Sequence, residues 1–432
     1  MALGEWRRTG HIDLEAVELL VRDVMHRAGA SALSRLLSIS TGHSAGVPCE
    51  CGQSARYHDT RPKQLLTVLG PVSIQRAYYV CPDCGRGQSP LDRKLDVEGT
   101  ECSPGVRRMM AVVGSDSSFD HSREQMELLA GLTVTTKAVE RHAEAIGSDI
   151  ERQQQVKIQG TLQLDLPGIL NADVKVLYIE VDGVQVPVCR SELAGRTGRI
   201  EGQPPRTRET KLGCVFTQTN TDEKGRPIRD EASTTYVGAI ETAEIFGPRI
   251  YTEAWERGWS RAQKKVILGD GADWIWNLAD QHFPGAIQIV DLYHARQKLW
   301  ELARALYPNQ EVEQKRWVMR HQHQLDEGQI ENLTHGLRSI ASSNPELDEK
   351  VRTAANYFEN NAERMRYPEF RRQHLFVGSG VIEAGCKTVI GSRLKQSGMF
   401  WTVKGANAII ALRCCRLSRK FADFWASRAP AA

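Results

Sequence analysis

The sequence predicts an α/β protein, because two apolar runs each end in an aspartate. Val266–Leu268 leads into Gly269-Asp270-Gly271 and then into helical spacing, which is the pattern of a buried strand, a tight turn and a helix. Residues 173–182 are almost continuously apolar, as expected of a central strand covered on both faces, and end at Asp182. The carboxyl ends of such strands are where α/β sheets place ligands and metals.

The order of the remaining elements narrows the fold class. We predict a second strand directly after Asp182-Gly183 and further strands at 211–217 and 286–290. Helical spacing predicts a helix at 241–257. The residues after 300 have helical spacing as far as about 370. Strand, strand, strand, helix, strand, helix, strand, helix is the order of an RNase H-like fold, here with an all-helical insertion.

Composition sets broad limits. The chain has 432 residues, 41% of them hydrophobic, which is room for roughly two to four domains. The formal net charge of +3 does not by itself indicate a polyanion binder. Between Arg364 and Lys420 basic residues well outnumber acidic ones, which suits a surface facing phosphates, although a solvated helix face is the alternative.

No run is long and apolar enough to cross a bilayer, and the first residues lack the apolar core of a signal peptide. We therefore expect a cytoplasmic protein without a membrane partner. In that compartment its 10 cysteines should be reduced or metal-bound rather than paired in disulfides.

Helical spacing over 13–39 predicts a helix pair, and two cysteine pairs follow it. The pairs flank two β-rich runs hinged at Gly70-Pro71, and each is followed by glycine. Tetrahedral zinc takes four thiolates from two such knuckles, so the pattern predicts a structural zinc ribbon with the ligands Cys49, Cys51, Cys81 and Cys84. The first pair is CxC rather than CxxC. His43 is an alternative ligand, and four unrelated buried thiols are the alternative interpretation.

Residues 122–142 have the pattern of a helix, a turn at Gly131-Leu132-Thr133 and a second helix opened by Thr135-Thr136. This is typical of a helix-turn-helix, whose second helix would present to a DNA groove the side chains of Thr136, Lys137, Arg141 and His142. A helix pair that serves only packing is the alternative. The polar stretch Glu151–Gln155 is predicted to be a linker and the main domain boundary.

Asp182, Asp270 and Glu383, which lies on a late helix, form the predicted catalytic set. In an RNase H-like sheet these positions converge at one edge of the active cleft. Clustered carboxylates raise one another's pKa unless cations neutralise them, and oxygen ligands select Mg²⁺ or Mn²⁺. Two such ions roughly 3.5–4 Å apart promote phosphodiester exchange. The alternative for Asp270 is a helix cap.

Other residues receive supporting roles. Lys387 shares a helix face with Glu383 and would hold a phosphate, with a surface salt bridge as the alternative. Asp291 and His294, three residues apart, would orient the metal site or contact DNA, and Asp291 is the substitute for Asp270. Further DNA contacts are predicted at Arg393, Lys395 and Trp401, the last by stacking on a base.

Four motifs stand in a fixed order: Asp182-Gly, Gly-Asp270-Gly-Ala, Asp291-xx-His294, and Gly-Val-Ile-Glu383-Ala-Gly-Cys-Lys followed by Arg-Leu-Lys395-xx-Gly-Met-x-Trp401. In this order they resemble bacterial insertion-sequence transposases of the DDE superfamily, specifically the ISKra type, and the broader Mutator-like group. The resemblance covers most of the chain, from the Cys81 knuckle to Arg413. It implies that the three acids are the catalytic triad and that the N-terminal region recognises transposon ends.

These observations together predict an insertion-sequence DNA transposase that performs two-metal-ion cleavage and strand transfer. Its partners would be double-stranded DNA, as transposon ends and target, and at least one further copy of itself. A nuclease of the same fold without strand transfer and a domesticated, non-catalytic DNA-binding regulator are the alternatives.

The predicted domains are N-terminal helices at 1–45, a zinc ribbon at 46–100, a helix-turn-helix region at 101–155, the first part of the core at 170–300, the helical insertion at 301–375 and the C-terminal core helices at 376–425.

Overall fold

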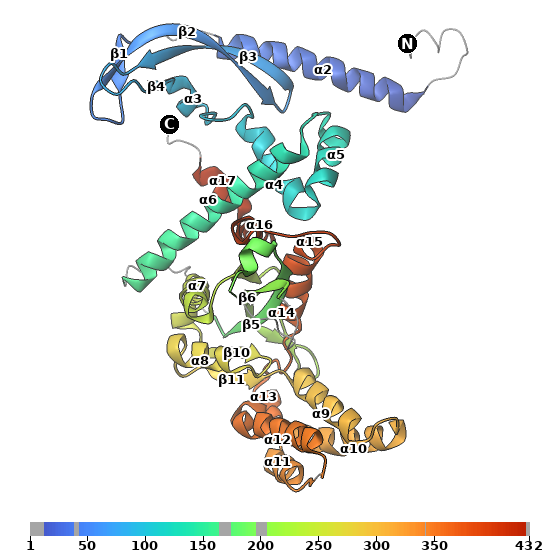
Figure 1. Ribbon diagram of the computed structural model, residues 1–432. Coiled ribbons are helices and arrows are strands. Elements are labelled where there is room, and N and C mark those ends of the chain that lie inside the picture. Colours follow the sequence, from blue (N-terminus) through green and yellow to red (C-terminus); the bar gives the residue numbers. More distant parts are fainter. Residues whose placement is uncertain (1–12, 39–42, 164–173, 196–204, 342, 429–432) are drawn as a thin grey trace. The chain divides into compact units, whose positions relative to one another are not determined.

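The structure is a computed structural model that describes residues 13–38, 43–163, 174–195, 205–341 and 343–428. The chain divides into two compact units (Figure 1). The first unit consists of Met1–Ile146 and Ala422–Ala432, and the second of Gly147–Phe421. Among the described residues, none of the helices combines the length and the apolar character that a membrane span requires.

The first unit contains a four-stranded antiparallel sheet in the order β1-β2-β3-β4. Its centre is the predicted hairpin, which turns at Gly70, where φ is 100°. The second half of α2 packs against this sheet through Ala30, Leu33 and Leu37. The elements are α2 (Leu14–Leu37), β1 (Gly46–Pro48), β2 (Ser54–Thr67), β3 (Gly70–Val80), β4 (Gly87–Gln88) and α3 (Pro90–Lys94).

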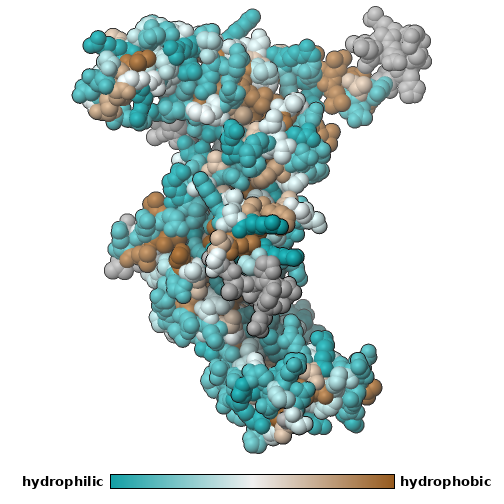
Figure 2. All heavy atoms as spheres, in the orientation of Figure 1, coloured by the Kyte–Doolittle hydropathy of each residue, from teal (hydrophilic) through white to brown (hydrophobic). Residues whose placement is uncertain are grey.

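Helix α2 is one continuous helix, so the predicted helix pair is wrong. Gly29 lies inside the helix, where a Cβ would be 3.2 Å from Leu69 Cδ1, and it therefore serves close packing and does not break the helix. Before Gly29 the helix exposes Leu14, Val21 and Met25 by 55% to 65%. Figure 2 shows this half as a brown patch over α2.

Three helices complete the first unit: α4 (Pro104–Asp116), α5 (Phe119–Ala130) and the beginning of α6 (Thr136–Leu162). Gly131 ends α5 with a φ of 66°, which confirms the turn predicted there. Met126, Leu132 and Val139 form part of the apolar cluster between these helices. The C-terminal helix α17 (Phe421–Ser427) begins at the end of the second unit and lies mostly in the first.

Helix α6 continues through Glu151–Gln155, so the linker predicted there is wrong. The stretch is polar because its side chains make specific contacts. Glu151 accepts hydrogen bonds from the guanidinium of Arg249 in helix α7 (Ala243–Glu256) at 2.8 and 3.0 Å. Gln155 donates to Glu151 one turn earlier at 2.8 Å. Composition alone does not separate such a helix face from a linker.

The second unit is built on a five-stranded mixed sheet in the order β11-β10-β5-β6-β9. β11, β10 and β5 are parallel, whereas β6 pairs antiparallel with both β5 and β9. The predicted strands at 211–217, 266–268 and 286–290 are confirmed. The strands are β5 (Val176–Pro187), β6 (Thr207–Gln218), β9 (Thr235–Ala239), β10 (Lys264–Gly269) and β11 (Ile287–Val290), and β7 (Asn220–Thr221) and β8 (Pro227–Ile228) form a separate small pair.

The sequence analysis predicted a break between two strands at Asp182-Gly183. This prediction is wrong, because both residues lie within the single strand β5. The ladder with β6 runs through it, and Gly183 lies opposite Lys211. A Cβ at Gly183 would lie 2.5 Å from Glu209 Oε1, so the Glu209 side chain fills the space that a larger residue would need. The strand β9 was missed by the sequence analysis.

Helices cover both faces of the five-stranded sheet. On one face Phe246 and Ile250 of α7 pack on Gly213 of β6. On the other, Gly385 at the end of α14 packs on Tyr236 of β9, and Ile410 of α16 packs on Gly238. The core helices are α8 (Asp273–His282), α14 (Gly380–Gly385), a π-helical turn η4 (Cys386–Gly391), α15 (Ser392–Leu394) and α16 (Val403–Leu417), with the short turns η1 (Arg190–Leu193) and η2 (Trp259–Arg261).

Between β11 and α14 the chain is helical, as predicted for an insertion in this region. The packing of α9 with α10, of α11 with α12, and of α9 with α12 makes this a separate helical layer of the second unit (Figure 1). The elements are α9 (Leu292–Leu306), α10 (Glu311–Asp326), α11 (Ile330–Arg338), α12 (Pro345–Asn360), η3 (Ala362–Met365) and α13 (Tyr367–Arg372).

Candidate functional site

Two of the predicted acids come from adjacent parallel strands. β10 pairs with β5 so that Leu268, near the end of β10, lies beside Glu180. Asp270 is the first residue after β10, and its charge is close enough to raise the pKa of Asp182. Asp182 lies within β5, two residues after Glu180 and on the same face of the sheet. This is the face that α14 and η4 cover.

Asp182 is partly buried and accepts two hydrogen bonds. Its Oδ1 accepts from the main-chain N–H of Gly183 at 2.6 Å, and its Oδ2 accepts from Cys386 Sγ at 3.4 Å. Burial raises the pKa of Asp182, and the negative charge of Asp270 raises it further. A carboxylate under these conditions gains from a nearby cation.

Asp270 belongs to the turn between β10 and α8. Its Oδ1 accepts from the N–H of Ala272 at 3.0 Å, and its Oδ2 has no hydrogen bond within the described part of the chain. Ala272, not Asp270, is the N-cap of α8. Asp270 is therefore not the helix cap that was the alternative interpretation. Its Oδ2 is available to bind a metal ion.

Glu383 approaches the same face from α14. The N–H of the preceding residue, Ile382, donates to Glu180 Oε2 at 2.8 Å and so fixes this helix over β5. Cys386, one turn after Glu383, contacts Asp182. The Glu383 side chain itself is exposed. Its charge contributes to the raised pKa of Cys386, after burial and the larger contribution of Asp182.

Sequence analysis gave Glu180 no role in the site. It is fully buried, and burial raises its pKa to about 8. Within the described residues its Oε1 has no hydrogen-bond partner. The available signal was its position: a glutamate inside an apolar run, two residues before Asp182 and on the same strand face.

Asp291 has a different environment from Asp270. It is 1% exposed and is the N-cap of α9, where Oδ1 accepts from the N–H of His294 at 2.6 Å. Its Oδ2 accepts from the N–H of Ser379, and from Ser379 Oγ at 2.7 Å. Both oxygens are thus occupied, which favours Asp270 as the metal ligand. The positive form of His294 is close enough to Asp182 to oppose the rise in its pKa.

The carboxylates of Asp182, Asp270 and Glu383 are not all close enough together to bind one metal ion. In the described part of the chain, the four predicted zinc ligands are the only group of three or more His, Cys, Asp or Glu residues whose ligand atoms all lie within 4.8 Å of one another. At least one pair among Asp182, Asp270 and Glu383 is therefore farther apart than this. The arrangement is an open set of acids on one sheet face.

The predicted DNA contacts of the C-terminal segment separate into two groups. Lys387 and Lys395 are exposed. The positive charge of Lys395 opposes the rise in the pKa of Cys386. Arg393 and Trp401 are 0% and 6% exposed, and Trp401 Nε1 donates to the carbonyl of Leu394 at 3.1 Å. Because both side chains lie in the core, we do not include them in a DNA-binding surface.

The cysteine cluster lies at one end of the β2–β3 hairpin. Cys49 Sγ is 3.6 Å from Cys84 Sγ, and Cys51 Sγ is 3.6 Å from Cys81 Sγ. The cluster could hold a metal ion through four thiolates, so the predicted grouping of these cysteines is confirmed. His43 instead stacks on Tyr57, with a ring separation of 4.0 Å.

Both knuckles are shaped by a glycine. Gly52 and Gly85 have φ of 86° and 70°, and their N–H groups donate to the carbonyls of Cys49 and Cys81 at 2.9 Å. Hydrogen bonding from the Cys84 N–H lowers the pKa of Cys81 to about 7. The CxC spacing of the first pair is therefore compatible with a tight knuckle.

In the predicted helix-turn-helix, the start of α6 carries four polar candidates, of which His142 is half-buried, and burial lowers its pKa. Thr136 Oγ1 donates to Asp120 of α5 at 2.9 Å, so this hydroxyl joins the two helices. Lys137 pairs with Glu140 at 2.7 Å and remains 69% exposed. Arg141 is exposed and has no ion pair among the described residues.

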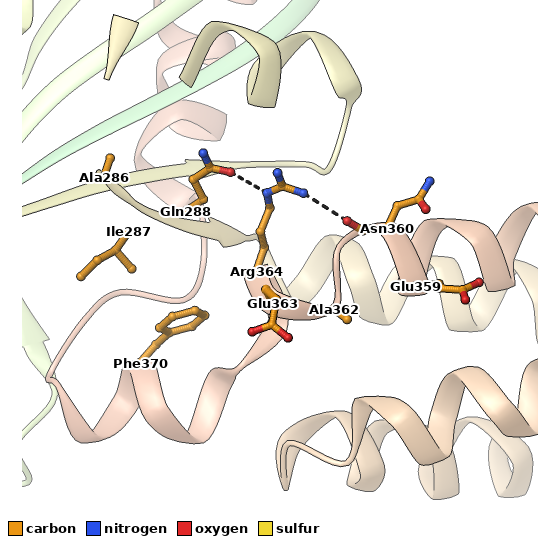
Figure 3. Close-up of a pocket in the computed structure, with 9 residues that line it drawn as sticks. All are labelled: Ala286, Ile287, Gln288, Glu359, Asn360, Ala362, Glu363, Arg364 and Phe370. Carbon is orange, nitrogen blue, oxygen red and sulfur yellow. Dashed lines mark hydrogen bonds between the residues drawn. The ribbon is translucent and has the colours of Figure 1, made fainter. Parts of the chain in front are cut away.

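A cavity of about 620 Å³ lies between β11, η3 and α13 (Figure 3). Its lining includes Gln288, Arg364 and Phe370. None of the proposed acids lines it, so we do not place the candidate chemistry there.

Comparison with known proteins gives limited matches. The model of an uncharacterised protein family, UPF0236, matches residues 50–204. Two UPF0236 proteins of Caldanaerobacter subterraneus subsp. tengcongensis are each 23% identical, over 363 and 361 residues, which is 81% of this chain and 67% of theirs.

Among solved structures, the strand transfer complex of Drosophila P element transposase has a TM-score of 0.25 and 9% identity. The similarity covers 77% of this chain and 83% of that one. A TM-score this low does not establish a shared fold.

Proposed function

We propose that this chain is an insertion-sequence DNA transposase of the DDE type, with an RNase H-like catalytic core. The observation that carries the proposal is the proximity of Asp270, which directly follows β10, to Asp182 on the adjacent parallel strand β5, with Glu383 on a helix over β5. The sheet order β11-β10-β5-β6-β9, with β6 antiparallel, supports the RNase H-like assignment. Acids in this arrangement suit oxygen-ligated divalent ions.

The donor set fits Mg²⁺ or Mn²⁺. Burial and the negative charge of Asp270 raise the pKa of Asp182, so a cation held by these two residues would stabilise the ionised form of Asp182. Asp182 and Asp270 would hold the ions, with Glu383 completing the set from α14. When bound, two such ions activate an attacking oxygen and stabilise the leaving oxygen of a phosphodiester.

The side chains around the acids have defined tasks in such a reaction. Lys387 and Lys395 are exposed on the segment that contacts the site and would hold backbone phosphates. A water oxygen attacks phosphorus at the element's end, and the bond from phosphorus to the 3′ oxygen breaks to leave a 3′-hydroxyl. That hydroxyl then attacks a target phosphorus and joins the strands, releasing a target 3′-hydroxyl.

Two features of the first unit support DNA end recognition as part of this function. The cysteine cluster, which we assign to zinc because four thiolates are its preferred structural ligand set, stabilises the hairpin. The α5–α6 pair offers Lys137 and Arg141 on an exposed helix face.

The test uses the full chain with labelled DNA that carries the element's ends. Asp182→Asn should bind the DNA as wild type does, while Mg²⁺-dependent strand cleavage falls by at least about 100-fold, the scale of losing a charge-stabilising group in a phosphoryl-transfer site. Asp273→Asn, an exposed acid in the first turn of α8, is the matched control and should cleave normally. Cleavage retained in Asp182→Asn would remove the assignment.

The same assay separates the alternative functions. A transposase yields joined products in which the end is attached to target DNA. A nuclease of the same fold yields cut products only. A DNA-binding regulator yields neither in Mg²⁺ or Mn²⁺, although it retains sequence-specific binding.

A further inference from the structure

The helical segment between β11 and α14 holds the carboxyl ends of two core strands. Tyr357 of α12 donates from its hydroxyl to the main-chain carbonyl of Asp270, just after β10, at 2.9 Å. Tyr367 of α13 donates in the same way to the carbonyl of Val290, the last residue of β11, at 3.1 Å. Two tyrosines of the insertion thus bind the two strand ends that precede Asp270 and Asp291.

A third contact fixes the base of the insertion to the same edge of the sheet. Arg364 Nε donates to Gln288 Oε1 of β11 at 2.6 Å, and its Nη1 donates to the carbonyl of Asn360 at 3.1 Å (Figure 3). The guanidinium also lies over the Trp276 ring of α8, 4.7 Å from its centroid. The end of α12, which carries Tyr357, is therefore anchored to both β11 and α8.

Besides its hydrogen bond, Tyr357 packs its ring against the turn that follows Asp270. Gly271 has a φ of 94°, and a Cβ there would lie 2.6 Å from Cε2 of the Tyr357 ring. The ring therefore lies directly against the glycine. Asn361 Nδ2 donates to the carbonyl of Tyr357 at 2.9 Å, which holds the main chain of the tyrosine in place.

The consequence concerns the direction of the Asp270 carboxylate. Its Oδ1 is bound to the N–H of Ala272, within the same turn. The side chain is thus oriented by the turn, and the turn is held from outside by Tyr357. Without the hydroxyl, the Asp270 carbonyl and the peptide that follows it can rotate, and the carboxylate rotates with them.

We propose that Tyr357 is a positioning residue for Asp270: through the turn at Gly271 it holds this carboxylate in the direction needed to share a divalent ion with Asp182. The inference rests on the proposed metal-dependent function. It gives the helical insertion a defined task, because an element inserted between the second and third acids then determines the geometry of the second.

The test compares Tyr357→Phe with Tyr367→Phe in the full-length, zinc-loaded protein. Both variants remove one hydroxyl that donates to a main-chain carbonyl, and both keep the ring. Only Tyr357 contacts the turn of a proposed ligand. The first readout is Mn²⁺ affinity by electron paramagnetic resonance, without DNA, and the second is strand cleavage as a function of Mg²⁺ concentration.

For Tyr357→Phe we expect Mn²⁺ binding to weaken about 2- to 10-fold, the range given by loss of one neutral hydrogen bond, with the same shift in the Mg²⁺ concentration for half-maximal cleavage. Cleavage at saturating metal should approach the wild-type rate, and Tyr367→Phe should bind Mn²⁺ as wild type does. Thermal unfolding of both variants is measured alongside, because a purely structural role lowers stability without moving metal affinity.

Three results would overturn the inference. Unchanged Mn²⁺ affinity in Tyr357→Phe would show that the hydroxyl does not position Asp270. Equal weakening in both variants would show a general effect of the insertion. If wild type binds Mn²⁺ only at the level of Asp182→Asn and does not cleave, the proposed function fails and this inference fails with it, whereas the first two results leave the proposed function intact.

Discussion

At the scale of single residues, Arg249 is a buried charge that joins α6 to α7 in the second unit. It is 1% exposed and its guanidinium donates to Glu151 and Glu241 with distances between 2.7 and 3.0 Å. Burial opposes ionisation of Glu151, but the hydrogen bonds from Arg249 outweigh it and hold its pKa below the usual value. The pair joins α6 to α7 from inside the protein.

Replacing Arg249 should therefore be costly. We predict that Arg249→Ala lowers the free energy of unfolding by about 3–5 kcal/mol, because it leaves two carboxylates without their buried partner. The measurement is urea unfolding followed by tryptophan fluorescence. Arg352→Ala is the matched control: Arg352 is 61% exposed, pairs with Glu349 on the helix surface and should change stability little.

The ion pair between Arg249 and Glu151 makes the stability of the protein depend on pH, and the direction of this dependence follows from the lowered pKa of Glu151. A carboxyl whose pKa is lowered by folding stabilises the protein above its unfolded pKa, and this contribution is lost as the pH falls through the lowered value. The stability difference between wild type and Arg249→Ala should thus shrink under acid. A difference that stays constant, or grows on acidification, would contradict the assigned ion pair.

At the scale of elements, the β2–β3 hairpin and the four-cysteine cluster at its end depend on each other. The thiols come from two knuckles that the hairpin brings together, and among the described residues the buried cluster at this end of the sheet is small. The buried residues there are Cys49, Ala55, Tyr79 and Cys81. A metal ion would then supply folding free energy that the apolar contacts do not.

We predict that Cys81→Ser loses the bound zinc and disorders the hairpin, whereas Cys102→Ser retains zinc, because Cys102 lies outside the cluster. Metal analysis of the purified variants gives the zinc content, and proteolysis followed by mass spectrometry locates the disorder. One zinc per chain in Cys81→Ser, or none in wild type, would be incompatible with the four-thiolate site.

The α5–α6 pair allows a separate prediction about DNA. Arg141→Ala should weaken binding to the element's ends and reduce the slope of log affinity against log salt by about 1, the effect of one lost phosphate contact. Arg152→Ala is the control on the same helix, since Arg152 is 73% exposed but lies beyond the predicted recognition segment. Equal effects of the two substitutions would indicate a diffuse electrostatic contribution.

At the scale of the whole molecule, the strands that carry Asp182 and Asp270 could be predicted because apolar runs ending in an acid are local signals. The hairpin and the α5–α6 turn were predictable for the same reason, through their glycines. Gly183 was misinterpreted as a turn, since only the neighbouring strand explains it: Glu209 occupies the space a Cβ would need. The strand β9 lacked a strong enough local pattern.

The candidate site was predictable in its residue types but not in its supports. Asp291 and Asp270 have similar sequence contexts, and only the hydrogen bonds from Ser379 and His294 show that Asp291 is already saturated. Trp401 and Arg393 looked like surface residues in a basic, glycine-containing segment, yet both are buried. Tyr357 lies 87 residues from Asp270 along the chain, so no local pattern connects them.

The most direct test of the central claim is anomalous scattering from crystals of the full chain grown with Mn²⁺ and element-end DNA. The account predicts manganese bound between Asp182 and Asp270, with a Glu383 oxygen bound either to the ion directly or to one of its waters, and a scissile phosphate alongside. Manganese elsewhere on the chain only, or Glu383 turned away from an ion bound by the two aspartates, would contradict it.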